Sequence, residues 1–91
     1  MEKSLHSEGY SLFLRQLRAT RKSAGVTQIE LAKRLDETQS FVSKCERGER
    51  RIDVVELREF CRALGVPFNE FTGRLDAGMT RKRPATGQRK A

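Results

Sequence analysis

Residues 27–48 read TQIELAKRLDETQSFVSKCERG, and this stretch gives the strongest structural signal in the chain. Thr27, followed three residues later by Glu30, forms the capping-box pattern that starts a helix. Thr38 is the next N-cap candidate, after a short acidic connection. The stretch therefore predicts two short helices joined by a tight turn, at about residues 27–36 and 38–47.

In the segments on either side, capping residues and glycines also mark where helices begin and end. A first helix is predicted over about residues 8–24, and Gly25 is placed to end it in a left-handed conformation. Residues 53–56 (DVVE) repeat the capping-box pattern and start a fourth helix, which Gly65 ends. Because such short helices are not stable alone in water, we expect them to pack together around one core.

After the fourth helix the sequence loses its apolar residues and its helical periodicity within a few turns. Val66-Pro67 breaks its direction, and a short fifth helix is predicted over residues 68–73. Residues 74–91 have almost no apolar side chains and no periodicity, so we expect a disordered basic tail there. The predicted fold is an all-α, five-helix domain over residues 7–73.

Apolar residues recur at helical spacing and give each predicted helix an apolar face. The residues assigned to the core in this way are Tyr10, Phe13, Leu14, Leu17, Ala24, Ile29, Leu31, Ala32, Leu35, Val42, Cys45, Val54, Leu57, Phe60, Cys61 and Leu64. The two cysteines among them fit the role of small hydrophobic residues. They match no metal-ligand spacing, and the single histidine, His6, lies far from both in sequence, so no metal site is predicted.

The formal net charge is +7, and most of it lies outside the predicted domain. Residues 1–73 carry 13 Lys and Arg against 11 Asp and Glu, whereas residues 74–91 carry 6 against 1. A basic balance attracts polyanions in general, nucleic acid or an acidic membrane surface alike. The charge by itself therefore does not identify the partner.

Several functional classes lack a signal in the sequence. No apolar run approaches the roughly 20 residues that a membrane span needs, and the amino-terminal residues lack the apolar stretch of a signal peptide, so we expect a cytoplasmic protein. There is no Ser/His/Asp set, no Cys–His pair on shared elements and no phosphate-binding glycine loop. We therefore expect no enzymatic activity, no cofactor and no small-molecule ligand.

The second of the two central helices presents a polar face, and together the two have the spacing of a helix-turn-helix. Five hydrogen-bonding side chains share that face through an i, i+1, i+4, i+5, i+8 pattern, namely Gln39, Ser40, Ser43, Lys44 and Arg47. Val42 and Cys45 point the other way. The major groove of DNA accepts one α-helix, and its base edges require donors and acceptors of this kind. The pattern therefore indicates double-stranded DNA as the partner.

The runs TQIELAKRL (27–35) and QSFVSKCERG (39–48) resemble the signature of the Cro and lambda-repressor-like (XRE-type) regulators. The resemblance covers roughly residues 10–72 and extends to RALGVP at 62–67. It implies a five-helix lambda-repressor-like DNA-binding domain, and members of this family usually bind palindromic operators as homodimers.

The resemblance also implies roles for individual residues. Gln28 matches a glutamine that contacts a phosphate and braces the first base reader, and Gln39 matches that reader, which can bond bidentately to adenine. Arg21 and Glu46 match a pair that joins the first and third helices as an internal salt bridge. The residues expected to contact DNA are Thr27, Gln28, Thr38, Gln39, Ser40, Ser43, Lys44, Arg47, Arg50 and Arg51.

A few positions depart from the family pattern or stay open. Asp36 stands in the turn where the family commonly has glycine, and aspartate tolerates a left-handed conformation better than most residues. Cys45 replaces a larger residue often found there. Glu37 either weakens non-specific DNA binding or points away from the DNA. Phe41 either lies at the edge of the core, which we favour, or contacts a thymine methyl group.

The sequence favours a sequence-specific transcriptional regulator, a repressor that acts as a homodimer on a palindromic operator. Phe68 and Phe71 are the candidate anchors of the dimer interface. The alternative is an antitoxin or another protein-interaction module with autoregulatory DNA binding, in which residues 74–91 cover a partner protein. Against it, that segment offers only Leu75 and Met79 as apolar anchors. A restriction–modification controller is a further variant within the regulator class.

Overall fold

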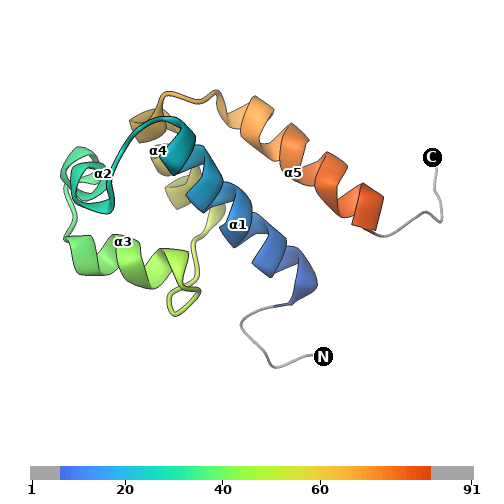
Figure 1. Ribbon diagram of the computed structural model, residues 1–91, viewed down its shortest axis with the longest axis horizontal. Coiled ribbons are helices and arrows are strands. Elements are labelled where there is room, and N and C mark those ends of the chain that lie inside the picture. The colour runs from blue at the N-terminus through green and yellow to red at the C-terminus, as the bar shows by residue number, and fades with distance from the viewer. Residues whose placement is uncertain (1–6, 83–91) are drawn as a thin grey trace.

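The computed structural model of the chain describes residues 7–82, and within this range it contains five helices and no strand (Figure 1). The helices are α1 (Glu8–Ser23), α2 (Gln28–Leu35), α3 (Gln39–Glu46), α4 (Val54–Leu64) and α5 (Phe68–Lys82). The predicted all-α, five-helix fold is thereby confirmed. None of these five helices is long and apolar enough to cross a membrane.

Side-chain caps start the helices where the sequence predicts them. The Oγ1 of Thr27 accepts a hydrogen bond from the backbone N–H of Glu30 (3.0 Å), and Thr38 caps α3 in the same way (3.1 Å). At α4 the capping box is complete, because Asp53 accepts from the N–H of Glu56 (2.7 Å) and the Glu56 carboxylate accepts from the N–H of Asp53 (3.0 Å). These bonds satisfy N–H groups that have no partner within their own helix.

Asp36 makes the turn between α2 and α3. Its backbone has φ 61° and ψ 43°, and it is the only non-glycine residue with a positive φ among the described residues. Most L-residues enter this region at a cost of roughly 1–2 kcal/mol, and Asp and Asn visit it more readily than the others. The turn therefore survives without glycine and brings α2 and α3 against each other.

α1 is the central helix of the bundle. α5 runs antiparallel beside it, α3 packs on another side of it, and α2 packs against both α3 and α4 (Figure 1). All five helices contribute apolar side chains to one core, which consists of Phe13, Leu14, Leu17, Val26, Leu31, Ala32, Val42, Cys45, Leu57, Phe60, Cys61, Leu64 and Phe71. This core fixes how α2 and α3 stand relative to the rest of the molecule.

α5 is longer than the sequence predicts. The predicted fifth helix ends at Gly73 and a disordered tail follows from residue 74, but the helix continues to Lys82. The prediction is therefore wrong for the first part of the tail. The remainder of the predicted tail, residues 83–91, lies outside the described residues.

Contacts with α1 explain the extra turns of α5. Leu75 packs against the core, and the Cε of Met79 lies 3.2 Å from where a Cβ would stand at Gly9. A Cβ at Gly78 would in turn lie 3.3 Å from the Cδ2 of Leu12. Glycine at these two positions allows the helices to approach closely, so a few apolar side chains are enough to hold a segment whose composition looks disordered.

Three residues assigned to the core are exposed. Ile29 and Val54 are 55% and 66% exposed, and Ala24, the C-cap of α1, is exposed as well. Ile29 lies two residues before Leu31, about 200° around the helix, so it points away from the core. Val54 is the first residue of α4 and lines an open groove beside the ends of α1 and α5.

Candidate nucleic-acid interface

α3 turns a polar face to solvent. Val42 and Cys45 are fully buried beneath it. The outward side chains are the five that the sequence predicts, of which Ser43 is half-buried and Gln39, Ser40, Lys44 and Arg47 are exposed. The face therefore offers both donors and acceptors of hydrogen bonds to a partner.

A chain of hydrogen bonds links the first residue of this face to the interior. The Nε2 of Gln39 donates to the Oε1 of Gln28 (3.2 Å), and the Nε2 of Gln28 donates to the Oε1 of Glu46 (2.9 Å). Glu46 in turn accepts from Arg21. The side chain of Gln39 is thus oriented by α2 and, through α2, by a buried ion pair.

Arg21 and Glu46, expected to pair, form a bidentate salt bridge between α1 and α3. The Nε of Arg21 lies 2.7 Å from the Oε2 of Glu46, its Nη2 lies 3.1 Å from the Oε1, and the side chains are only 10% and 2% exposed. The third nitrogen, Nη1, donates to the carbonyl of Val26 (3.0 Å). Because every nitrogen of the guanidinium and both oxygens of the carboxylate make a hydrogen bond, the pair tolerates burial.

Arg18 adds a contact that the sequence analysis missed. Its Nη1 donates to the backbone carbonyl of Glu46 at the end of α3 (3.2 Å). A cation near the last carbonyls of a helix also interacts favourably with the helix dipole. Arg18 lies one turn before Arg21 on α1, and this spacing was the available signal.

Thr27 and Thr38 lie at the N-termini of α2 and α3. Each hydroxyl oxygen accepts the capping hydrogen bond, which leaves the hydroxyl hydrogen available as a donor. The two helix N-termini, with their partial positive charge, suit phosphate oxygens. The side chain of Gln28 stands beside the first of them.

The two arginines after α3, Arg50 and Arg51, are exposed but make contacts within the chain. Arg50 forms a bidentate pair with Glu56 (3.1 and 2.8 Å), and its guanidinium lies 4.8 Å from the ring centre of Phe41. The hydrogen bond from Arg50, with that from the N–H of Asp53, holds the pKa of Glu56 below its usual value. Arg50 thereby ties the loop after α3 to the start of α4.

Arg51 has a comparable structural contact. Its guanidinium lies 4.3 Å from the ring centre of Tyr10, and the Tyr10 hydroxyl accepts a hydrogen bond from the backbone N–H of Ile52 (3.0 Å). In the structure Arg50 and Arg51 make contacts that shape the loop, and their contact with the DNA backbone stays a prediction. Sequence reasoning missed these contacts because Tyr10 is distant in the chain and Glu56 is brought to Arg50 only by the fold of the loop.

The remaining cations of the polar face differ from each other. Lys44 is exposed, and its side chain makes no hydrogen bond or ion pair within residues 7–82. Arg47 is exposed too but is bonded to Glu49 and Ser43. Lys44 is thus available to a partner in this arrangement, whereas Arg47 is occupied.

The cysteines have the surroundings of core residues. Cys45 and Cys61 are 0% and 1% exposed, and both are free thiols. Burial raises the pKa of both, although the guanidinium of Arg50 partly opposes this at Cys45. Within the described residues no group of three or more His, Cys, Asp or Glu side chains could hold a metal ion.

Phe71 cannot anchor a dimer in the way predicted. It is fully buried, and its ring packs edge-to-face on Phe13, with centroids 6.1 Å apart at 82°. Its backbone carbonyl accepts a hydrogen bond from the Nε2 of Gln16 (2.8 Å). The prediction is wrong because the apolar face of α5 packs on α1 of the same chain. Phe68 is half-buried against the same core.

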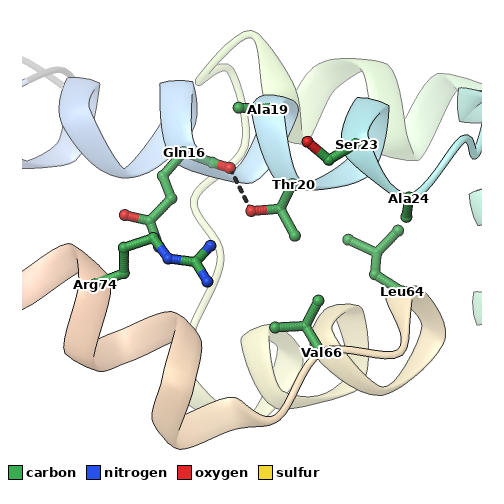
Figure 2. Close-up of a pocket in the computed structure, with 8 residues that line it drawn as sticks. All are labelled: Gln16, Ala19, Thr20, Ser23, Ala24, Leu64, Val66 and Arg74. Carbon is green, nitrogen blue, oxygen red and sulfur yellow. Dashed lines mark hydrogen bonds between the residues drawn. The ribbon is translucent and has the colours of Figure 1, made fainter.

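A groove lies between α1 and the start of α5 (Figure 2). Its lining residues are Gln16, Ala19, Thr20, Ser23, Ala24, Leu64, Val66 and Arg74. The hydroxyl of Thr20 is bonded to the Gln16 carbonyl (2.7 Å), and Arg74, the one charged residue of the lining, is paired with Glu70 (2.9 Å). The charged residue of this groove is therefore already paired within the chain.

The helix-turn-helix family matches residues 17–71, more than half of the chain. Among solved structures, the chain is similar to an XRE-family like protein from Pseudomonas syringae pv. tomato str. DC3000, with 45% identity, a TM-score of 0.77, and coverage of 84% of this chain and 93% of that one.

The chain is also similar to two structures of the clp gene regulator ClgR from Corynebacterium glutamicum. The first has 26% identity, a TM-score of 0.69, and coverage of 90% of this chain and 83% of that one. The second has 27% identity, a TM-score of 0.68, and coverage of 86% and 96%. A comparison with curated proteins gave no match. The matched region contains α2, α3 and the polar face, and the chain belongs to the XRE-type helix-turn-helix family of DNA-binding transcription regulators.

Proposed function

We propose that the chain is a cytoplasmic, sequence-specific transcriptional repressor that binds a palindromic operator as a homodimer, with α3 in the major groove. The main support is the polar face of α3, whose leading residue, Gln39, is held by Gln28. A side chain oriented before binding loses less conformational entropy when it meets its target.

Each residue of the interface has a proposed role that follows from its chemistry. Gln39 bonds to N6 and N7 of an adenine, the bidentate pairing that a glutamine amide allows. Gln28, with the N-terminus of α2, contacts a phosphate. Ser40 and Lys44 reach further along the groove to base edges or phosphates. Arg50 and Arg51 act indirectly, because their contacts shape the loop beside the DNA.

The homodimer places two α3 helices in successive major grooves, about 34 Å apart on one face of the duplex. An interface with two-fold symmetry needs a patch that matches itself. With Phe71 buried, we assign this patch to the start of α4, where Val54 and Val55 are 66% and 67% exposed. In the single chain most of the apolar surface of these two valines is therefore open to a partner.

The antitoxin alternative loses its main sequence support. It rested on residues 74–91 as an extension over a partner protein, a segment in which Leu75 and Met79 are the only apolar anchors that the sequence offers. In the structure both side chains are partly buried and face α1, Leu75 against the core and Met79 against Gly9. We therefore favour the repressor.

The test is selection of binding sites from random duplex oligonucleotides with the purified protein. We expect an enriched palindrome whose half-sites are centred about 10–10.5 base pairs apart, as two α3 helices on one face of the DNA require. Absence of any enriched sequence at low salt would contradict the proposal. An enriched single half-site would retain DNA recognition and reject the dimer.

A further inference from the structure

Arg47 follows α3 directly as its C-cap, and two neighbours hold its guanidinium. Its Nε and Nη2 donate to the two carboxylate oxygens of Glu49 (2.9 and 3.2 Å), and its Nη1 donates to the Oγ of Ser43. All three nitrogens are therefore engaged within the chain. Since Ser43 and Arg47 both belong to the polar face, this contact occupies two of its five side chains.

The backbone after α3 brings Glu49 to this position. Gly48 has φ 81°, the N–H of Gly48 donates to the carbonyl of Cys45 (3.1 Å), and the N–H of Glu49 donates to the carbonyl of Lys44 (2.9 Å). This is the Schellman pattern, which folds the chain back over the last turn of a helix. A glutamate two residues after the C-cap is thus carried toward the polar face and not away from it.

The Arg47–Glu49 pair has little to do with the stability of the fold. The two side chains are 53% and 54% exposed, and exposed pairs of this kind contribute little to the stability of a fold. The hydrogen bond from Arg47, and the positive charges of Arg47 and Lys44, hold the pKa of Glu49 below its ordinary value. Glu49 is therefore ionised at neutral pH and stands beside both cations of the face.

We propose that Glu49 is a negative determinant of DNA affinity, because its carboxylate occupies Arg47 in the free protein and a DNA phosphate must displace it before Arg47 and Ser43 engage the duplex. This inference rests on the proposed DNA binding. When DNA binds, a phosphate replaces the Glu49 carboxylate at the guanidinium of Arg47. Because one anion is exchanged for another, Arg47 adds little to the affinity of weak, sequence-independent binding. It adds to binding where the other residues of α3 already hold a phosphate in place.

The experiment compares the wild-type chain with E49Q on a short random-sequence duplex over a range of salt concentrations. We expect E49Q to bind about three- to tenfold more tightly at low salt, since it releases one arginine from an exposed pair. The slope of log K against log salt should steepen by about 0.9, the contribution of one further neutralised phosphate.

E70Q is the matched control. Glu70 forms a pair with Arg74 at the same distance as the closest Arg47–Glu49 contact (2.9 Å) and with closely similar exposure (56% and 53%). E70Q changes the net charge by the same amount, but on α5, which lies on the far side of α1 from α3 (Figure 1). We expect its affinity to stay within about twofold of wild type, as a remote and screened charge predicts.

The same comparison in an R47Q variant distinguishes two explanations for a gain in affinity: release of Arg47 from Glu49, or loss of the repulsion between Glu49 and a phosphate. In R47Q there is no arginine to release, so adding E49Q should give no further gain. An equal gain in both backgrounds overturns the proposal, and so does E49Q binding no tighter than wild type while wild type itself binds DNA. A wild-type chain that binds no duplex at low salt overturns the proposed function as well, so the two failures are distinguishable.

Discussion

Glu46 and Arg47 are neighbours in the chain, yet they belong to two ion pairs of opposite character. Glu46 pairs with Arg21 in the interior, where the side chains are 2% and 10% exposed. Arg47 pairs with Glu49 on the surface, where both are more than half exposed. Contact distances barely distinguish the pairs, since the shortest are 2.7 and 2.9 Å. Burial is what separates them.

The two pairs give one short helix both a fixed position in the fold and an exchangeable surface charge. The buried pair fixes α3 to α1 and, through Gln28, orients the first residue of the polar face. The exposed pair is weak, so a ligand can replace it at small cost. A buried ion pair therefore holds the inner face of α3, while the charge at its outer face is exchangeable.

The largest effect is expected from E46Q, which leaves Arg21 buried without a counter-charge. Breaking one side of a buried pair costs about 3–5 kcal/mol of unfolding free energy. Urea denaturation of E46Q and wild type measures this loss, with E70Q as the exposed control, for which about 0–1 kcal/mol is expected. A loss in E46Q no larger than in E70Q would remove the distinction between the two kinds of pair.

A smaller effect, on binding, is expected from Q28A. The variant removes the link between Glu46 and Gln39, while Glu46 keeps both hydrogen bonds from Arg21. Stability should fall by about 1 kcal/mol or less, the net value of one hydrogen bond. Affinity for the selected operator should fall about tenfold, equal to about 1.4 kcal/mol. Fluorescence anisotropy measures the affinity, and an unchanged value would show that the link does not orient the reader.

The smallest effect is expected from E56Q, which tests a pair of intermediate exposure (Arg50 43%, Glu56 30%). A neutral glutamine keeps an acceptor for the cap but loses the ion pair, so stability at pH 7 should fall by about 0.5–1 kcal/mol.

The pH dependence of this loss has a defined sign. The pKa of Glu56 is below its ordinary value of 4.5 in the folded protein, so the ionised group stabilises the fold above that pH. The contribution is lost as the pH falls through the folded pKa. Unfolding curves of wild type and E56Q should therefore converge in acid, and a constant difference between them would contradict the assignment.

Local signals in the sequence were sufficient to predict the starts of α2, α3 and α4 and the turn between α2 and α3. Thr27, Thr38 and Asp53 cap their helices as predicted, since a cap depends on residues only three positions apart. The outward face of α3 follows from helical spacing alone. Asp36 adopts the left-handed turn that its residue type allows.

What the sequence did not reveal depends on contacts between distant segments. α5 extends to Lys82 because Met79 meets Gly9, and no local pattern reports this contact. Phe71 looked like an exposed anchor, but it packs on Phe13. The engagement of Arg50 likewise depends on the loop bringing it to Glu56.

We propose that Gln39, the first residue of a polar face that is fixed to the core, reads a base. The most direct measurement is binding-site selection with wild type and Q39A in parallel. We expect both proteins to enrich the same palindrome, and Q39A to lose the preference for adenine at one symmetric pair of positions while the other positions stay unchanged. Identical base preferences at every position of the two selected sites would contradict it.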